Sequence, residues 1–188
     1  MVAGADPNPG AAAARGELAG KEVQMESQVD PLIAMLVDGL DEAFDHRSWH
    51  GTNLRGSIRR VTVEQARWRP GSGRHNIWEI AVHTAYWKYA VWRKLTGATR
   101  GSFAFKGSNW FARPVRGEGD EAWAADVKLL VAQHRQLRAA VRELAPAPLE
   151  RPFAGSICTA AQLVRGVAAH DLYHAGQIQL LKRLQRRG

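Results

Sequence analysis

The chain has 188 residues, and 26 Lys or Arg against 18 Asp or Glu give it a formal net charge of +8. With 45% hydrophobic and 23% charged residues, the composition is that of a globular protein, which excludes collagen-like, wholly disordered and disulfide-framework classes. The single cysteine, Cys158, cannot form an internal disulfide. No apolar run approaches the roughly 18 residues of a membrane span, and no secretory signal is visible. We therefore expect one cytoplasmic domain with no membrane partner.

The positive charge is scattered along the chain and matches none of the usual nucleic-acid docking motifs. The one compact basic cluster lies at the end of the last predicted helix, at Lys182, Arg183, Arg186 and Arg187. Cations at a helix C-terminus interact favourably with the helix dipole, which accounts for this cluster. We expect no specific nucleic-acid partner.

Residues 1–28 are predicted to form a flexible tail, because they combine turn residues with few bulky apolar side chains. The remaining residues, 29–188, are predicted to form one domain. Its first helix should begin near Asp30, a good N-cap that is followed by Pro31. Apolar residues then recur at helical spacing at Ile33, Leu36, Val37, Leu40 and Phe44.

A break at 49–52 precedes a short helix that ends at Ile58 and is capped by Thr52 or Asn53. One more turn is predicted within 61–68, before the loop at 69–73. Three long amphipathic helices follow, at 76–95, 120–143 and 159–184. Together with the first helix they predict an all-α four-helix bundle.

The segment 98–119, between the second and third long helices, is irregular and unusually aromatic. Gly, Ser and Pro occur throughout it, together with Phe103, Phe105, Trp110 and Phe111. A loop this long inside a compact domain usually has a function of its own. We expect it to cover part of the bundle.

The most informative polar residues are the pair His170 and His174 in the last helix. Four residues make about one helical turn, so the two imidazoles lie roughly 6 Å apart on one face. At about 100° per residue, that face coincides with the apolar stripe that carries Leu163 and Leu181. Two inward imidazoles each need a buried partner, and one transition-metal ion supplies it for both.

His83, beside Ile80 and Trp87 in the second long helix, is positioned to add a third nitrogen from a facing helix. Three protein ligands leave at least one coordination position open, which is the catalytic arrangement. Such a site can generate hydroxide, polarise a carbonyl or bind a thiolate.

Each of the remaining polar candidates has a simpler interpretation. His134 fits a hydrogen-bonded core histidine, and His75 fits a capping or loop group. His46 and His50 fit surface positions. Gln177 lies one turn past His174, where it either supports a ligand or is only a polar core group. We interpret Cys158, near a helix start, as structural.

Two segments resemble the DinB-like (DinB/YfiT) superfamily. The segment 75–83, HNIWEIAVH, resembles its second-helix signature, in which an early Trp is followed by an inward His. The segment 168–178, AAHDLYHAGQI, resembles its fourth-helix signature, with the paired His and the following Gly-Gln. Trp49-His50-Gly51 and the Trp110 loop are also similar to family members. The resemblance covers about residues 30–185.

The resemblance implies a four-helix bundle in which His83, His170 and His174 hold a divalent metal, and it makes a homodimer plausible. Its characterised members include thiol-dependent enzymes, such as mycothiol-dependent maleylpyruvate isomerase and bacillithiol S-transferase. Other members are assigned as metal-dependent hydrolases, and many have no known activity. The family name comes from DNA-damage induction and does not imply DNA binding.

Three functions therefore stay open. The first is a thiol-dependent S-transferase or isomerase-like enzyme acting on a small electrophile, with a low-molecular-weight thiol as a further cofactor. In this case Arg113 or Arg116 would attract carboxylates of the thiol or the substrate. The second is a hydrolase with water as the nucleophile, and the third is a non-catalytic stress-related binding protein. The metal is Zn, Ni or Fe, and three imidazoles also suit Cu.

Overall fold

The computed structural model describes residues 30–145, 149, 151–152 and 157–186. The tail predicted for residues 1–28 lies outside these residues. The described part contains no strand and six helices, namely α1 (Pro31–Phe44), α2 (Leu54–Ile58), α3 (Val63–Arg67), α4 (Ile77–Thr96), α5 (Asp120–Arg142) and α6 (Ala160–Leu184). The predicted all-α fold is therefore confirmed.

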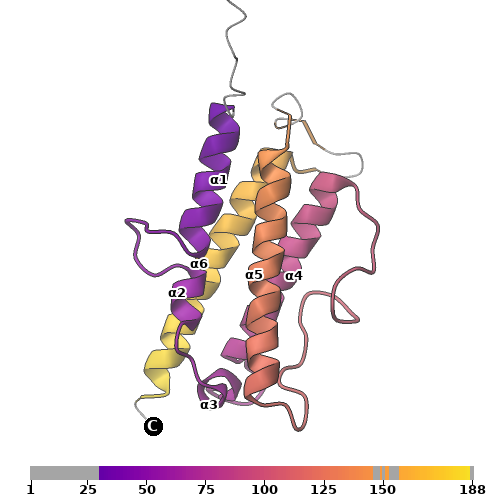
Figure 1. The fold of residues 1–188 in the computed structure, drawn as a ribbon. Helices are drawn as coiled ribbons and strands as arrows, with labels where there is room; N and C mark the ends of the chain where they lie inside the picture. Colours follow the sequence, from indigo (N-terminus) through magenta and orange to yellow (C-terminus); the bar gives the residue numbers. More distant parts are fainter. Residues whose placement is uncertain (1–29, 146–148, 150, 153–156, 187–188) are drawn as a thin grey trace, which may run out of the picture.

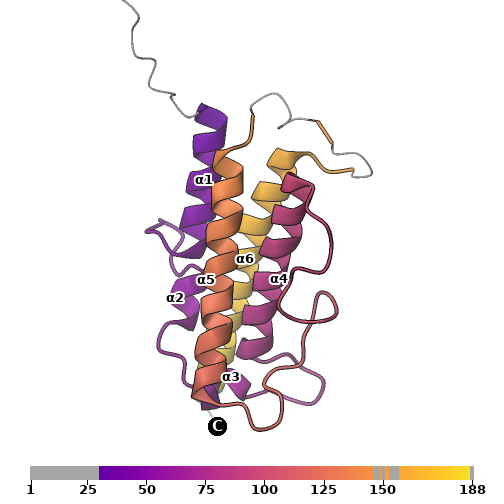
Figure 2. The ribbon, with the colours of Figure 1, turned by 45° about the vertical axis from the view of Figure 1, so that its right-hand side comes forward.

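The four long helices α1, α4, α5 and α6 form a bundle, with the short helices α2 and α3 at one end (Figures 1 and 2). In both views α1 and α6 run in one direction, and α4 and α5 run in the other. Because α4 and α5 are parallel, the segment between them must return along the whole length of the bundle. This topology explains why residues 97–119 form such a long connection.

The helix ends follow from local capping chemistry. Asp30 accepts hydrogen bonds from the backbone N–H groups of Leu32 and Ile33 at the start of α1. Capping boxes begin α4, at Asn76 with Glu79, and α6, at Thr159 with Gln162. At the other end of α4, Gly97 adopts the left-handed conformation with φ 70°, which is the usual way to end a helix.

The helix α1 is shorter than the other three, and α2 compensates for its length. In Figure 1, α2 lies below the end of α1 and beside the lower half of α6. Asn53, one of the two predicted caps, accepts the hydrogen bond from Gly56 that starts α2. Leu54 and Ile58 from this short helix are buried in the core.

A buried polar layer divides the hydrophobic core into two clusters. The layer takes one residue from each long helix, and these are Asp41, Lys88, His134 and Asp171. On every helix the polar residue falls between side chains of the two clusters. Lys88 donates to Asp171, and both side chains are fully buried. The two charges therefore compensate each other inside the bundle.

His134 and Asp41 form the other half of this layer. His134 Nε2 lies 3.6 Å from Asp41 Oδ1, and Arg138 donates to the same carboxylate at 2.7 Å. The His134 ring stacks on Phe44 with centroids 3.8 Å apart. His134 is therefore buried in the core as predicted, but its contact with Asp41 is longer than a hydrogen bond and its Nδ1 has no hydrogen-bond partner among the described residues.

The pH dependence of stability should reveal His134. Burial, reinforced by the positive charge of Lys88, lowers the pKa of His134 to about 3, although Asp41 acts in the opposite direction. Unfolding returns this pKa to about 6.5, so the unfolded chain binds more protons between these values and stability falls as the pH falls through this range. We expect the slope of unfolding free energy against pH to be smaller in His134→Phe, by up to about 1.4 kcal/mol per pH unit.

Urea unfolding at pH 6, 5 and 4 measures this slope. The matched control is His50→Phe, at an exposed position, which should leave the slope unchanged. An unchanged slope in His134→Phe would show that His134 is not buried in its neutral form.

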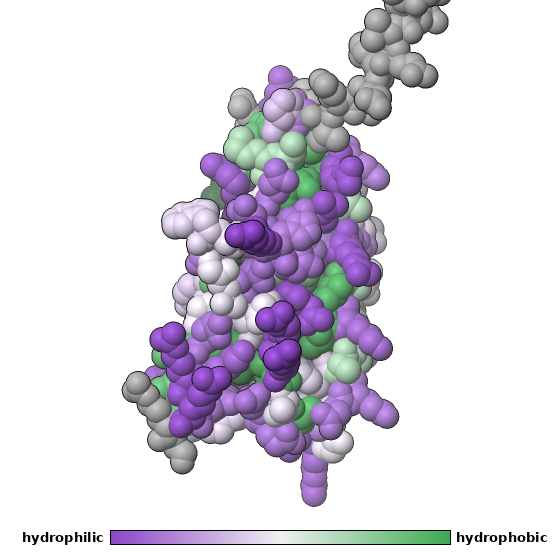
Figure 3. Space-filling model, turned by 60° about the vertical axis from the view of Figure 1, so that its left-hand side comes forward, coloured by the Kyte–Doolittle hydropathy of each residue, from purple (hydrophilic) through white to green (hydrophobic). Residues whose placement is uncertain are grey.

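The outer surface is mainly hydrophilic on the face drawn in Figure 3, where hydrophobic side chains form separate smaller areas. No helix in the described part of the chain is both long and apolar enough to cross a membrane.

Candidate metal centre

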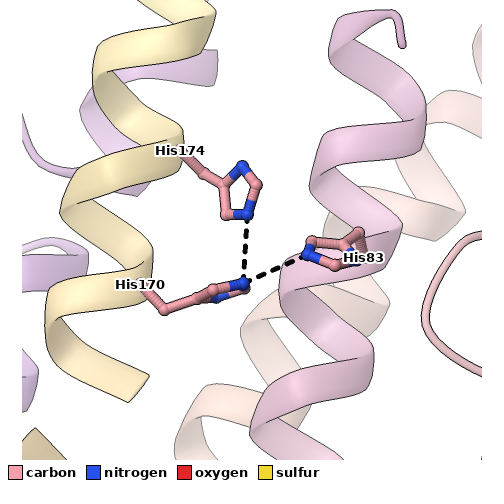
Figure 4. A group of neighbouring side chains, drawn as sticks. All are labelled: His83, His170 and His174. Atoms are coloured by element: carbon pink, nitrogen blue, oxygen red, sulfur yellow. Dashed lines mark hydrogen bonds between the residues drawn. The ribbon is translucent and has the colours of Figure 1, made fainter. Parts of the chain in front are cut away.

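Three histidines meet between α4 and α6 (Figure 4). His83 comes from α4, and His170 and His174 come from successive turns of α6. Nε2 of His170 lies 3.1 Å from Nε2 of His83 and 3.0 Å from Nε2 of His174. One nitrogen from each of the three residues lies within 4.8 Å of the others. The structure thus brings together the three side chains selected from the sequence.

The hydrogen bonds of Nδ1 in His83 and His174 indicate which nitrogen of each imidazole ring carries the proton. His83 Nδ1 lies 2.8 Å from the backbone carbonyl oxygen of Asn109. His174 Nδ1 lies 2.7 Å from Oε1 of Gln177. Both partners are acceptors, so both Nδ1 atoms donate, and Nε2 of each neutral ring carries a lone pair.

These lone pairs point at His170, whose buried Nδ1 has no hydrogen-bond partner among the described residues. A proton on Nε2 of His170 can serve only one of its two contacts. At least one lone pair therefore faces another nitrogen without a hydrogen between them. A cation at the centre relieves this repulsion.

The three rings are held neutral, as metal ligation requires. Burial is the largest cause in each case. It lowers the pKa of His170 to about 3, with further contributions from His174, His83 and Lys88. It lowers the pKa of His174 to about 4 and also lowers the pKa of His83.

The donor set and its spacing fit a transition metal. Metal–nitrogen bonds of about 2.0–2.1 Å in a tetrahedral site place ligand nitrogens about 3.3 Å apart, and the two contacts to His170 are within a few tenths of an ångström of this. Imidazole nitrogens favour Zn, Ni, Fe or Cu over Mg or Ca. The residues present therefore fit a divalent transition metal.

The three histidines line a pocket of about 560 Å³. Trp87 and Trp110 contribute indole rings to its wall. Trp110 is stacked between two imidazoles, with centroid distances of 3.8 Å to His83 and 3.6 Å to His75. The 98–119 loop thus covers part of the site, as we expected from its length and aromatic content.

A family sequence model described as the DinB superfamily matches residues 46–178, well over half of the chain. The chain belongs to the DinB superfamily. The matched range contains all three histidines and the loop that covers them. No curated protein and no solved structure matches the chain.

Asn109 is the residue at this DinB superfamily site that the sequence analysis missed. Besides its backbone contact with His83, its side-chain Oδ1 accepts from Trp87 Nε1 at 2.9 Å. Its φ of 68° places it in the left-handed region, where Asn is several-fold enriched among non-glycine residues. An Asn in a turn-rich loop is thus the one available signal, and it does not reveal the partner.

Gln177 had two interpretations, and its contact with His174 Nδ1 at 2.7 Å favours the supporting one. We expect Gln177→Leu to weaken Zn²⁺ binding about 10- to 100-fold, because the ring loses the acceptor that orients it. Gln177→Glu keeps an acceptor oxygen and should retain most of the affinity. Competition with a chromophoric chelator measures both values.

Gln179→Leu, on the same helix but outside the histidine pocket, is the matched control. Equal Zn²⁺ affinity in Gln177→Leu and Gln179→Leu would show that the hydrogen bond to His174 does not support metal binding.

The proposed role of Arg113 in attracting carboxylates is wrong. Its side chain is buried, and its Nε donates to Asp126 at 2.6 Å while its Nη1 donates to Glu118 at 2.6 Å. These contacts tie the loop to the start of α5. Among the described residues, neither Arg113 nor the exposed Arg116 lines the histidine pocket.

The remaining histidines lie at the positions predicted for them, and Cys158 has an additional contact with the histidine pocket. His46 and His50 are exposed. His75 directly precedes the N-cap of α4, and its Nδ1 lies 2.9 Å from Glu79 Oε2. Cys158, which we had interpreted as structural, is partly buried in the wall of the histidine pocket.

Proposed function

We propose that the protein is a divalent-metal-dependent enzyme that transfers or adds a thiol to a small electrophile, as an S-transferase or an isomerase-like enzyme. His83, His170 and His174 would hold the metal through Nε2. The observation that carries the proposal is the convergence of these three neutral imidazoles at the wall of a pocket. A structural metal site would instead be closed by a fourth protein ligand.

A divalent transition metal bound there supplies Lewis acidity, which favours the ionised form of a thiol or water and polarises a carbonyl oxygen. The protein side chains do the rest. The Asn109 carbonyl oxygen and Gln177 fix the rings of His83 and His174. The indoles of Trp87 and Trp110 shield the site from bulk water and hold an apolar substrate beside it.

A hydrolase is the second candidate, and one observation favours the thiol-dependent enzyme over it. Among the described residues no Asp or Glu lines the histidine pocket. A hydrolase gains from a carboxylate that takes the proton of the attacking water. A thiol is much more acidic than water and ionises without such a base.

A substrate screen with and without added thiol separates the candidates. The metal-loaded protein would be incubated with small epoxides, activated alkenes and aryl esters, in the presence or absence of a low-molecular-weight thiol. Turnover that requires both the metal and the thiol supports the proposal. Turnover that is independent of the thiol would establish the hydrolase. Failure to bind any transition metal would refute both.

A further inference from the structure

We propose that the histidine pocket takes an uncharged, apolar ligand body, aromatic or branched aliphatic, with one ionisable donor atom directed at the histidines. This proposal rests on the proposed metal function and narrows it. It excludes thiols and electrophiles that bear a carboxylate or phosphate in this pocket.

The wall of the pocket carries no formal charge among the residues that the structure describes. Its lining residues are histidines, indoles, small or aliphatic residues and a few neutral polar groups, namely His83, Trp87, Val91, Asn109, Trp110, Cys158, Gln162, Leu163, Gly166, Val167, His170, Tyr173 and His174. None of these described lining residues is a Lys, Arg, Asp or Glu. The three histidines would bind the metal as neutral imidazoles, so the described wall offers a ligand no charged side chain.

The neutral polar groups of the wall are also partly committed. The carbonyl oxygen of Asn109 accepts from His83, and its Oδ1 accepts from Trp87. Gln162 Oε1 accepts from the backbone N–H of Thr159 in the capping box. The side-chain oxygens of Asn109 and Gln162 are therefore already used as acceptors within the protein.

Two cations close in sequence to lining residues are held by other partners. Lys88 follows Trp87 in α4, but it is fully buried in its pair with Asp171. Arg113 follows Trp110 by three residues, but Asp126 and Glu118 hold it. The net charge of +8 thus does not reach the pocket through these two residues.

Charge balance then sets the chemistry of the ligand. One ionised donor atom beside a divalent metal is stabilised by the metal charge. A second negative charge on the ligand body beside Trp87, Trp110 and Leu163 would find no cationic side chain in the described wall. A cavity of about 560 Å³ accommodates a small organic molecule.

A pair of matched thiols tests the proposal by direct binding. Thiophenol and 4-mercaptobenzoate differ only in a carboxylate on the far side of the ring. The protein is first loaded with Co²⁺, and each thiol is then titrated while the thiolate-to-cobalt charge-transfer absorption is followed. We expect thiophenol to bind at least about tenfold more tightly, because the carboxylate lies against an apolar wall that offers it no charged partner. Equal affinity, or tighter binding of 4-mercaptobenzoate, would overturn the proposal.

The uptake of Co²⁺ is measured before any thiol is added, so the two proposals fail in different ways. Absence of uptake would refute the metal function and, with it, this inference. Uptake without selectivity between the thiols would refute the inference alone.

Leu163→Arg introduces the missing cation into the wall. We expect it to reduce the preference for thiophenol at least severalfold, because 4-mercaptobenzoate gains an ion-pair partner. Met35→Arg, at a 65% exposed position on α1, is the control and should keep the native preference. If Leu163→Arg folds, binds Co²⁺ and keeps the native preference, the wall does not set charge selectivity and the proposal is wrong. The titration of the native protein decides the proposal even if Leu163→Arg does not fold.

Discussion

Replacing His170 with alanine is expected to abolish metal binding. His170 Nε2 lies within 3.1 Å of Nε2 of His83 and of His174, so it takes part in both short contacts of the cluster. Its removal leaves two imidazoles from different helices and opens a second coordination position. We expect the Zn²⁺ content after reconstitution and dialysis to fall from about one equivalent per chain to below about a tenth, by elemental analysis.

His50→Ala is the matched control, because His50 is an exposed histidine outside the cluster. It should keep the full metal content. A full equivalent of Zn²⁺ in His170→Ala would show that His170 is not needed to hold the metal. Circular dichroism of the metal-free proteins would confirm that both variants retain their helices.

Lys88→Met should cause a large loss of stability, measured as a lower free energy of unfolding. The substitution removes the only cation that contacts Asp171 among the described residues, and Asp171 is 0% exposed. Breaking a buried ion pair on one side costs about 3–5 kcal/mol. The Asp171 carboxyl must either stay charged without a partner or take up a proton on folding, and both cost free energy at pH 7. Urea unfolding at pH 7 measures this loss.

The double variant Lys88→Met/Asp171→Leu separates two quantities: the net contribution of the ion pair to stability, and the destabilisation caused by removing only one of its partners. Replacing both charges with apolar groups of similar volume is often nearly neutral, so we expect most of the lost stability to return. Lys94→Met, at an exposed position on the same helix, should change stability little. A double variant as unstable as Lys88→Met would mean that the damage is steric.

The unfolding free energy of Lys88→Met should also depend on pH in a defined direction. Burial already raises the pKa of Asp171 to about 6, against the opposing effect of Lys88. Without Lys88 that pKa is higher still. At pH 7 the folded variant then binds a proton that the unfolded chain releases, whereas the native protein binds this proton only near pH 6 and below. The stability deficit of the variant should therefore shrink as the pH falls from 7 to about 6 and change little below that.

The sequence predicted the helices well because their boundaries depend on local chemistry. Asp30, Asn76 and Thr159 each cap the helix whose start they predict. Gly97 ends α4 where the predicted pattern stops. Apolar spacing identified the inner faces, since burial follows the helical period. No comparable local pattern in the sequence indicates the direction in which each helix runs in the bundle.

For the candidate site, the sequence predicted the three clustered histidines better than their surroundings. His170 and His174 share a helix face through their spacing alone. The position of His83 beside Ile80 and Trp87 indicated a third nitrogen, and the family resemblance pointed to the same residue. The role of Arg113 was wrongly predicted because its partner Asp126 lies on α5, outside the loop that carries Arg113. Asn109 was missed because its contact with His83 spans 26 residues of sequence. Long-range contacts of this kind are set by packing and not by local pattern.

The long return between the parallel helices α4 and α5 has a consequence for folding. His83 meets its supporting carbonyl oxygen only after this connection has closed, and it meets His170 only after α6 has packed on α4. No two adjacent helices of the chain carry the three imidazoles. A metal ion would therefore find its complete binding site only in the finished bundle. Binding there would slow unfolding and leave the folding rate almost unchanged. The ion would therefore stabilise the native state without speeding its formation.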